Sequence, residues 1–209
     1  LFEHNLFNPN LNYKVFSVPG LVVMLLTLIC GFLPALNIGS EKEIGTIEQI
    51  NVTPVGRFTF ILAKLIPYWI IGLVVLTICF GLAWLFYGIL PVGHFLVIYF
   101  FAAIFILSVS GLGLVISNSS ATMQQAMFVI FFCLLILMLM SGLFTPINSM
   151  PGWAQLITRF NPLRYMIDVI RMVYLKGSGF TDLIPHLWVL IAFTLFLNGW
   201  AVISYRKNS

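Results

Sequence analysis

Long apolar runs separated by shorter polar segments dominate the pattern along the 209 residues of the chain. A helix that crosses a bilayer needs about 20 mainly apolar residues, because a rise of about 1.5 Å per residue must cover about 30 Å of hydrocarbon. Polar and apolar residues do not alternate in these runs, as they would in the strands of a membrane barrel. The pattern therefore predicts an all-α, polytopic membrane protein with five transmembrane helices, at about residues 16–36, 58–87, 95–116, 126–143 and 187–205.

The first polar segment, residues 37–54, holds three of the six acidic residues of the chain. Ser40 and Glu43 form a capping-box pattern, which marks the start of a helix. Apolar residues then recur at a spacing of three, at Ile44, Ile47 and Ile50. The segment is predicted to form a short amphipathic helix, about residues 40–53, at the membrane surface. From these residues alone it is either a solvated interfacial helix without a partner or a helix whose polar side meets a soluble protein.

The second polar segment runs from about residue 145 to residue 185 and is too long for a simple turn. Apolar residues at helical spacing predict a helix over residues 163–175, with Arg164, Asp168 and Arg171 on an opposing stripe. We expect interfacial or re-entrant helices here, before the last span. The polar stripe is interpreted either as pairing along the helix surface, at spacings of four and three, or as a polar lining at the outer mouth of a pathway.

Composition supports a membrane location and excludes several classes of protein. Hydrophobic residues make up 61% of the chain and charged residues 8%, with a mean hydropathy of +1.07. Soluble domains contain about 25% charged residues, so too few are present here to cover a water-facing surface, and ten Lys or Arg residues are too few for nucleic-acid binding.

Basic residues fail to orient the spans, because they divide equally between the two sides. One side holds Lys42, Arg57, Lys64, Arg206 and Lys207, and the other holds Lys14, Arg159, Arg164, Arg171 and Lys176.

Candidate chemistry is sparse. The middle of each predicted span lacks acidic, basic and His residues, which ion-coupled carriers ordinarily need, and no phosphate-binding loop motif occurs. Energy for uphill transport would therefore come from another polypeptide. We predict no catalytic residue and no metal site, since the three cysteines lie singly in apolar runs and the three histidines lie near span ends. Lys64, close to the start of the second run, is interpreted as an interfacial anchor that reaches the headgroups.

Two stretches of the sequence resemble the ABC-2 type permeases, the membrane subunits of bacterial ABC exporters, and are most similar to the multidrug or uncharacterised-export branch. The first comprises residues 41–54, which read EKEIGTIEQINVTP, followed by Lys64 and Pro67-Tyr68. The second comprises residues 150–155, which read MPGWAQ, then residues 161–165, which read NPLRY, then Arg171 and residues 175–177, which read LKG. Both stretches occur in the expected order, so the resemblance covers almost the whole chain.

The resemblance implies an orientation that the charge count did not supply. Residues 40–53 would be cytoplasmic and form the coupling helix that docks on an ATPase subunit, whereas residues 144–185 would be external. The residues carried over as ATPase contacts are Glu41, Glu43, Gly45, Thr46, Glu48 and Gln49. Residues 1–15 would be the tail of an external domain, residues 16–205 the transmembrane domain and residues 206–209 a cytoplasmic tail. The first helix of the family and its external domain are expected to be absent from these 209 residues.

The function implied by the resemblance is that of a permease subunit in an ATP-driven exporter of the bacterial inner membrane. It would pair with a second permease subunit, expected to be a copy of itself, and with an ABC ATPase that binds the ATP. The chain itself would bind no cofactor and would not be an enzyme, and its substrate would be drug-like or lipid-like. An alternative of another class is a membrane scaffold or assembly factor that shares the spans and transports nothing.

Overall fold

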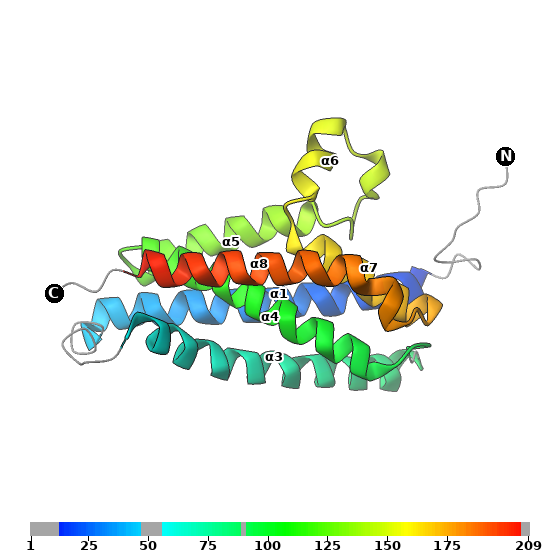
Figure 1. The fold of residues 1–209 in the computed structure, drawn as a ribbon, viewed down its shortest axis with the longest axis horizontal. Helices are drawn as coiled ribbons and strands as arrows, with labels where there is room; N and C mark the ends of the chain where they lie inside the picture. The colour runs from blue at the N-terminus through cyan, green and yellow to red at the C-terminus, as the bar shows by residue number, and fades with distance from the viewer. Residues whose placement is uncertain (1–12, 47–55, 89–90, 206–209) are drawn as a thin grey trace.

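The fold was analysed in a computed structural model, which describes residues 13–46, 56–88 and 91–205 (Figure 1). Every regular element in this part of the chain is helical, which confirms the all-α prediction. The longer helices are α1 (Tyr13–Ile44), α3 (Arg57–Tyr87), α4 (Phe95–Ser119), α5 (Met123–Leu139), α7 (Pro162–Lys176) and α8 (Ile184–Ser204). A short helix α6 (Gly152–Thr158) and single 3-10 turns at Ile147–Ser149 and Phe180–Leu183 complete the described elements.

Four of the helices, namely α1, α3, α4 and α8, are long and apolar enough to cross a membrane. The predicted starts of the second and third spans lie within one residue of the starts of α3 and α4. The fourth predicted span corresponds to α5, which has 17 residues and is shorter than the other four. The count of five spans is therefore not confirmed by helix length alone.

Two boundaries differ from the prediction. Helix α1 continues to Ile44, so Ser40 lies inside a helix instead of capping a new one. Ile38, two residues earlier, is fully buried in a cluster with side chains of α3, α4 and the end of α8, and this packing outweighs the local capping pattern. Helix α5 ends four residues before the end of its apolar run, and Gly142 beyond it has a φ of 81°, a left-handed conformation that does not continue a helix.

The centre of the bundle is formed by α4, which packs extensively against both α1 and α8. Small residues allow the close approach: a Cβ atom on Gly113 would overlap the backbone oxygen of Gly31 in α1, and one on Gly111 would lie 2.9 Å from the side chain of Asn198 in α8. Small residues let helices pack closely in this way, which helps membrane helices to associate without a hydrophobic driving force.

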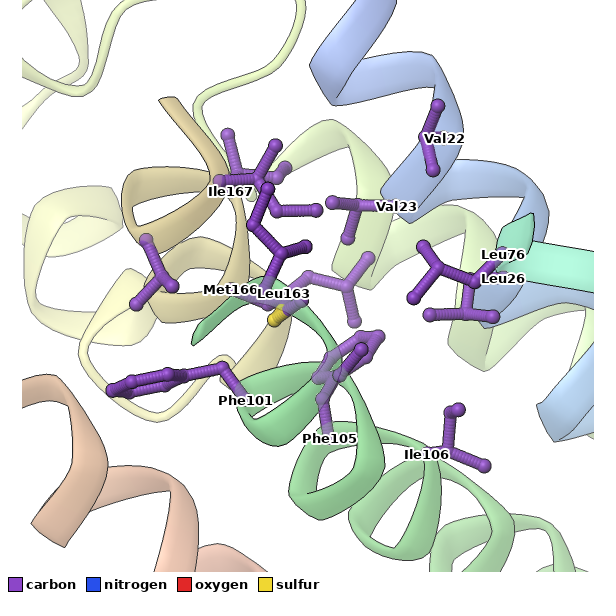
Figure 2. Packing of buried hydrophobic residues seen from close by; sticks show 14 of the residues in the cluster. Val22, Val23, Leu26, Leu76, Phe101, Phe105, Ile106, Leu163, Met166 and Ile167 are labelled. Carbon is purple, nitrogen blue, oxygen red and sulfur yellow. The ribbon is translucent and has the colours of Figure 1, made fainter. Parts of the chain in front are cut away.

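The largest buried apolar cluster joins α1, α4 and α7 (Figure 2). Phe105 of α4 lies between Leu26 of α1 and Met166 of α7, and Phe101, one turn earlier in α4, belongs to the same cluster. Helix α7 is thus part of the core at the end of the bundle that holds the start of α1. In contrast, α3 and α8 expose large apolar side chains along most of their length, which is typical of helices that face lipid.

Candidate functional site

Charged residues gather where α1 ends, beside the start of α3, the end of α4 and the start of α5 (Figure 1). Successive residues of an α-helix point in directions about 100° apart, because a turn holds about 3.6 residues. Glu41, Lys42 and Glu43 therefore reach different neighbours, and each one bonds to a different helix. These three residues, with the groups that they contact, are called the α1 junction below.

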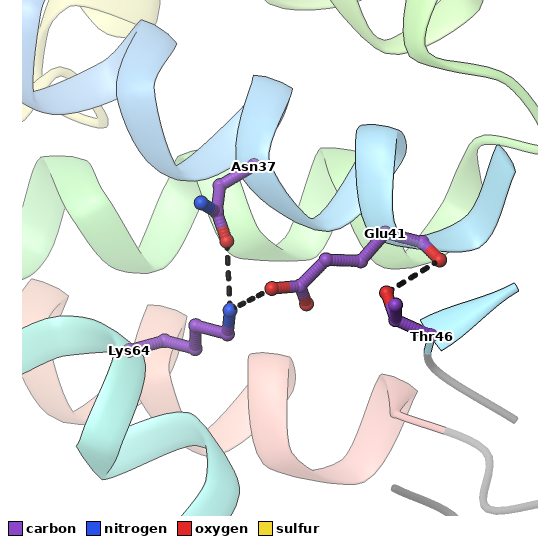
Figure 3. Close-up of polar contacts among 4 residues, drawn as sticks. All are labelled: Asn37, Glu41, Thr46 and Lys64. Atoms are coloured by element: carbon purple, nitrogen blue, oxygen red, sulfur yellow. Dashed lines mark hydrogen bonds and ion pairs between the residues drawn. The ribbon is translucent and has the colours of Figure 1, made fainter. Parts of the chain in front are cut away.

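Glu41 joins α1 to α3. Its carboxylate forms an ion pair with Lys64, and the Lys64 ammonium also donates a hydrogen bond to Asn37 Oδ1 at 2.8 Å (Figure 3). The side chains of Lys64 and Glu41 are only 20% and 22% exposed. Lys64 thus meets a carboxylate of its own chain, because α3 starts beside the end of α1, and its interpretation as an anchor to the headgroups stays a prediction.

Lys42 joins α1 to the end of α4. Its ammonium group donates to the backbone oxygens of Ser117, Asn118 and Ser120, at 2.8, 2.7 and 2.7 Å. The last carbonyl groups of a helix have no partner within it and carry partial negative charge. A lysine is well suited to this position, since it has three N–H donors and a positive charge.

Glu43 joins α1 to the start of α5. Its Oε1 accepts a hydrogen bond of 2.8 Å from the backbone N–H of Met123, the first residue of α5. The first N–H groups of a helix lack partners and attract negative charge, so a carboxylate stabilises this end. Gly39 lies against the same residue, and a Cβ atom there would be 2.9 Å from Met123 Cα. The two helices are therefore in backbone contact at this point.

The end of α4 is fastened to further helices. The Ser117 hydroxyl donates to the backbone oxygen of Ala35 in α1 at 2.6 Å, and the Asn118 amide donates to that of Ala201 in α8 at 2.9 Å. Phe60 of α3 stacks on Tyr205, directly after α8, with ring centroids 4.7 Å apart. The α1 junction thus lies among five helices that meet at one end of the bundle.

Four of the six residues predicted to contact an ATPase are described by the structure. Glu41 and Glu43 bond to other helices of their own chain, and the Thr46 hydroxyl donates to the backbone oxygen of Glu41 at 3.2 Å (Figure 3). Gly45 ends α1 with a φ of 83°, which favours glycine. The other two, Glu48 and Gln49, lie outside the described residues. Contact with an ATPase stays a prediction for all six.

Lys42 is the residue of the α1 junction that the sequence did not select. The resemblance carried over its neighbours Glu41 and Glu43 as ATPase contacts, but not Lys42. Its acceptors lie 75 to 78 residues away, at the end of another helix. The Ser-Asn-Ser-Ser run at residues 117–120 indicates a helix end, but nothing in the local sequence pairs that end with Lys42.

The second predicted site, the polar stripe on α7, lies at the opposite end of the bundle (Figure 1). The helix itself is confirmed, and Asn161 caps it by accepting a hydrogen bond of 3.0 Å from the N–H of Leu163. Arg164 donates to the hydroxyl of Thr158 at 2.9 Å, which ties α7 to α6.

Arg171 does not lie on an outer stripe. It is 8% exposed, and its guanidinium donates to the backbone oxygen of Gly142 at 3.3 Å. The prediction that the polar residues oppose the buried face is wrong here, because α7 contacts α1, α4 and α8 and is covered on several sides. Arg171 also lies over α1, where a Cβ atom on Gly20 would be 3.8 Å from its Nη2.

Asp168 lies between these charges. Burial raises the pKa of its carboxyl group, while the charges of His186, Arg164 and Arg171 act in the opposite direction. The three residues of the predicted stripe therefore influence one another electrostatically, together with a histidine of α8 that the sequence did not indicate. Over the part of the chain that the structure describes, no cluster of three or more His, Cys, Asp or Glu side chains is placed to hold a metal ion.

Comparison with known proteins finds a matching family and similar permeases. A family described as "ABC-2 family transporter protein" matches residues 1–203. The chain is 32% identical over 208 residues to the probable multidrug ABC transporter permease YbhR of Escherichia coli K12, covering 100% of this chain and 56% of the relative. It is 29% identical over 206 residues to the probable multidrug permease YbhS of the same organism, covering 97% and 54% of the two chains. The chain thus spans about half the length of these relatives.

Proposed function

Because the chain belongs to the ABC-2 transporter family, we propose that it forms the membrane path of an exporter driven by ATP hydrolysis on a separate ATPase subunit. The match to permeases of ABC transporters supports the membrane role. The direction of transport and the coupling to ATP are the parts that we add. We propose that the substrates are drug-like or lipid-like molecules. The relatives named as multidrug permeases support the drug-like class.

The proposed membrane topology has five spans in the inner membrane. Helix α5 is counted as a span because its 17 residues extend about 25 Å, which approaches the thickness of the hydrocarbon layer. The ends of α1 and α8 lie at the same end of the bundle (Figure 1). If the segment after α1 is cytoplasmic, as proposed, the end of α8 is cytoplasmic too, and α6 and α7 lie at the external surface.

The observation that carries the proposal is the α1 junction. An ATPase that docks on residues 40–53 would act where α1 is bonded to α3, α4 and α5. Movement imposed at this point is transmitted to several helices at once, which is what a permease needs in order to switch access between the two sides. We propose that two copies of the permease enclose the path and that each copy receives one ATPase subunit.

The proposal is tested by changing the docking segment in the full-length protein. Glu48→Lys reverses a charge in the segment proposed to face the ATPase, and we expect co-purification of the ATPase to fall at least about tenfold, a loss of about 1.4 kcal/mol in affinity. Lys176→Glu, a charge reversal at an exposed residue of the opposite end, is the matched control and should leave co-purification unchanged.

Reconstitution into vesicles separates a transporter from the scaffold alternative. A permease subunit should make the ATPase move dyes of a drug-like panel across the bilayer in the presence of ATP, and Glu48→Lys should abolish that movement. Unchanged co-purification in Glu48→Lys would contradict the docking segment. ATP turnover that ignores every compound, without movement of any dye, would contradict the permease role and support a scaffold.

A further inference from the structure

The connection between α4 and α5 is held at both ends by neighbouring residues of α1. The Lys42 ammonium donates hydrogen bonds to the backbone oxygens at the end of α4, and the Glu43 carboxylate accepts one from the first N–H group of α5. Only residues 120–122 separate the two helices. The charges match the helix ends that they contact, positive at the end of α4 and negative at the start of α5.

Helix α5 also packs more extensively against α1 than against α4. Below the contact of Gly39 with Met123, a Cβ atom on Gly31 would lie 3.1 Å from Leu134 Cδ1, and Ala35 of α1 is buried in one cluster with Ile130 and Leu134. The opposite side of α5 exposes apolar side chains, including Phe128, Phe132 and Ile136. Within the described residues, α1 therefore provides the principal support of α5.

We infer that Lys42 and Glu43 are positioning residues that force α5 to follow the end of α1, whereas Glu41 and Lys64 serve α3 in the same way. This inference rests on the proposed function, in which an ATPase moves the segment after α1. Glu41 then transmits that movement to α3, Lys42 to the end of α4 and Glu43 to the start of α5. Loss of one contact should uncouple one helix and leave the other coupled.

The chain offers two native reporters for this experiment. Cys133 lies in α5 and Cys79 lies in α3, and both are partly buried. In the full-length permease, two single-cysteine versions are made by replacing every other cysteine of the protein with alanine. Each is labelled with bimane, a small membrane-permeant fluorophore, and is studied in complex with the ATPase subunit. The change in bimane emission on adding ATP and vanadate reports movement of the labelled helix.

The central variant is Lys42→Met with Glu43→Gln, which removes both contacts to the α4–α5 connection. We expect it to abolish the nucleotide-dependent emission change at Cys133 and to preserve the change at Cys79. Glu41→Gln with Lys64→Met should give the reverse result, loss at Cys79 and preservation at Cys133. A merely structural role of these residues would affect both labels alike.

Three controls keep the result interpretable. Lys42→Arg retains a cationic donor for the carbonyl groups of α4 and should restore the response at Cys133 when Glu43 is unchanged. Lys176→Met removes an exposed lysine in the last turn of another helix and should change neither label. Monodisperse elution and the midpoint of thermal unfolding show whether each variant is folded. If the double variant is not, the single variants Lys42→Met and Glu43→Gln provide the test, and each should reduce the response at Cys133 and preserve the response at Cys79.

The outcomes separate this inference from the proposed function. Failure of the unmodified permease to retain the ATPase would defeat the proposed function itself. Retention of the ATPase with an unchanged response at Cys133 in the double variant would overturn the inference alone. Equal losses at both cysteines, or no response at Cys133 in the unmodified complex, would also overturn the inference. Loss of ATPase binding in the double variant would overturn it too, because Lys42 and Glu43 would then be docking contacts.

Discussion

The end of the bundle that holds the α1 junction and the end that holds α7 both carry charged side chains, but these side chains are bonded differently. At the α1 junction, Glu41, Lys42 and Glu43 contact groups that lie 23 to 80 residues away, in three other helices. At the α7 end, the hydrogen bonds that Arg164 and Arg171 donate to Thr158 and Gly142 span 6 and 29 residues and end in the segment between α5 and α7. One end ties separate helices together, while the other fixes the connection that precedes the last helix.

Charged residues of similar type therefore serve different purposes, depending on how far along the chain their contacts reach. Contacts between distant helices are placed to carry motion through the bundle. Contacts within one connection hold a local structure in place and are expected to matter more for folding than for coupling. Variants at the two ends should therefore differ in what they impair, and the predictions below test that difference.

The largest effect on stability is expected at the α7 end, for Arg171→Met. Arg171 is buried, donates to the backbone oxygen of Gly142 and acts electrostatically on Asp168. Removing one charge from a buried group of charges leaves the others uncompensated, which costs about 3 kcal/mol in the free energy of unfolding. The measurement is thermal or denaturant unfolding of the full-length permease in detergent. Arg164→Met, at a less buried arginine of the same helix, is the control, and an equal loss in the two variants would contradict the special role of burial.

A smaller loss is expected at the α1 junction, for Glu41→Lys. The variant places two positive charges side by side where an ion pair stood, but the site is partly exposed, so we expect a loss of about 1 kcal/mol. Glu41→Lys combined with Lys64→Glu restores opposite charges and should recover most of the stability and the response of the Cys79 label. Additive losses in the double variant would show that the two residues do not act as a pair.

The smallest effect concerns the dependence of stability on pH through Asp168. Burial raises the pKa of this carboxyl group in the folded protein, against the opposing charges of His186, Arg164 and Arg171. A raised pKa means that the folded state binds the proton more tightly than the unfolded state does, so stability is lost as pH rises through the folded pKa. Asp168→Asn should therefore gain stability relative to the unmodified protein as pH rises from 4 to 7. Unfolding midpoints measured across that range test this, and a relative loss would show that the arginines need the carboxylate more than burial penalises it.

Helices whose signals lie within one stretch of the sequence were predicted well. The apolar spacing over residues 163–175 predicted α7, since this signal acts within one helix. The four long apolar runs predicted α1, α3, α4 and α8, because only helices satisfy backbone groups inside a bilayer. The resemblance carried by residues 41–54 and 150–177 predicted the family.

Features that depend on distant contacts were not predicted. The capping pattern of Ser40 and Glu43 indicated a new helix, but Glu43 instead bonds to Met123, 80 residues away, and α1 continues. Helical spacing assigned Arg171 to a polar stripe, because spacing shows which residues share a side but not how many sides of the helix are covered. In both cases tertiary packing decided the outcome.

The contact between Gly113 and Gly31 is a pivot point for α1. The two backbones are in direct contact at this point, and a tilt of α1 about the contact would move its two ends in opposite directions. The α1 junction lies ten to twelve residues from Gly31 and Gly20 lies eleven residues away on the other side, so both lever arms are about 15–18 Å long. A tilt that draws the α1 junction in one direction would swing Gly20, beneath Arg171, by a similar amount in the other. Helix α1 would in this way connect the two charged ends of the bundle.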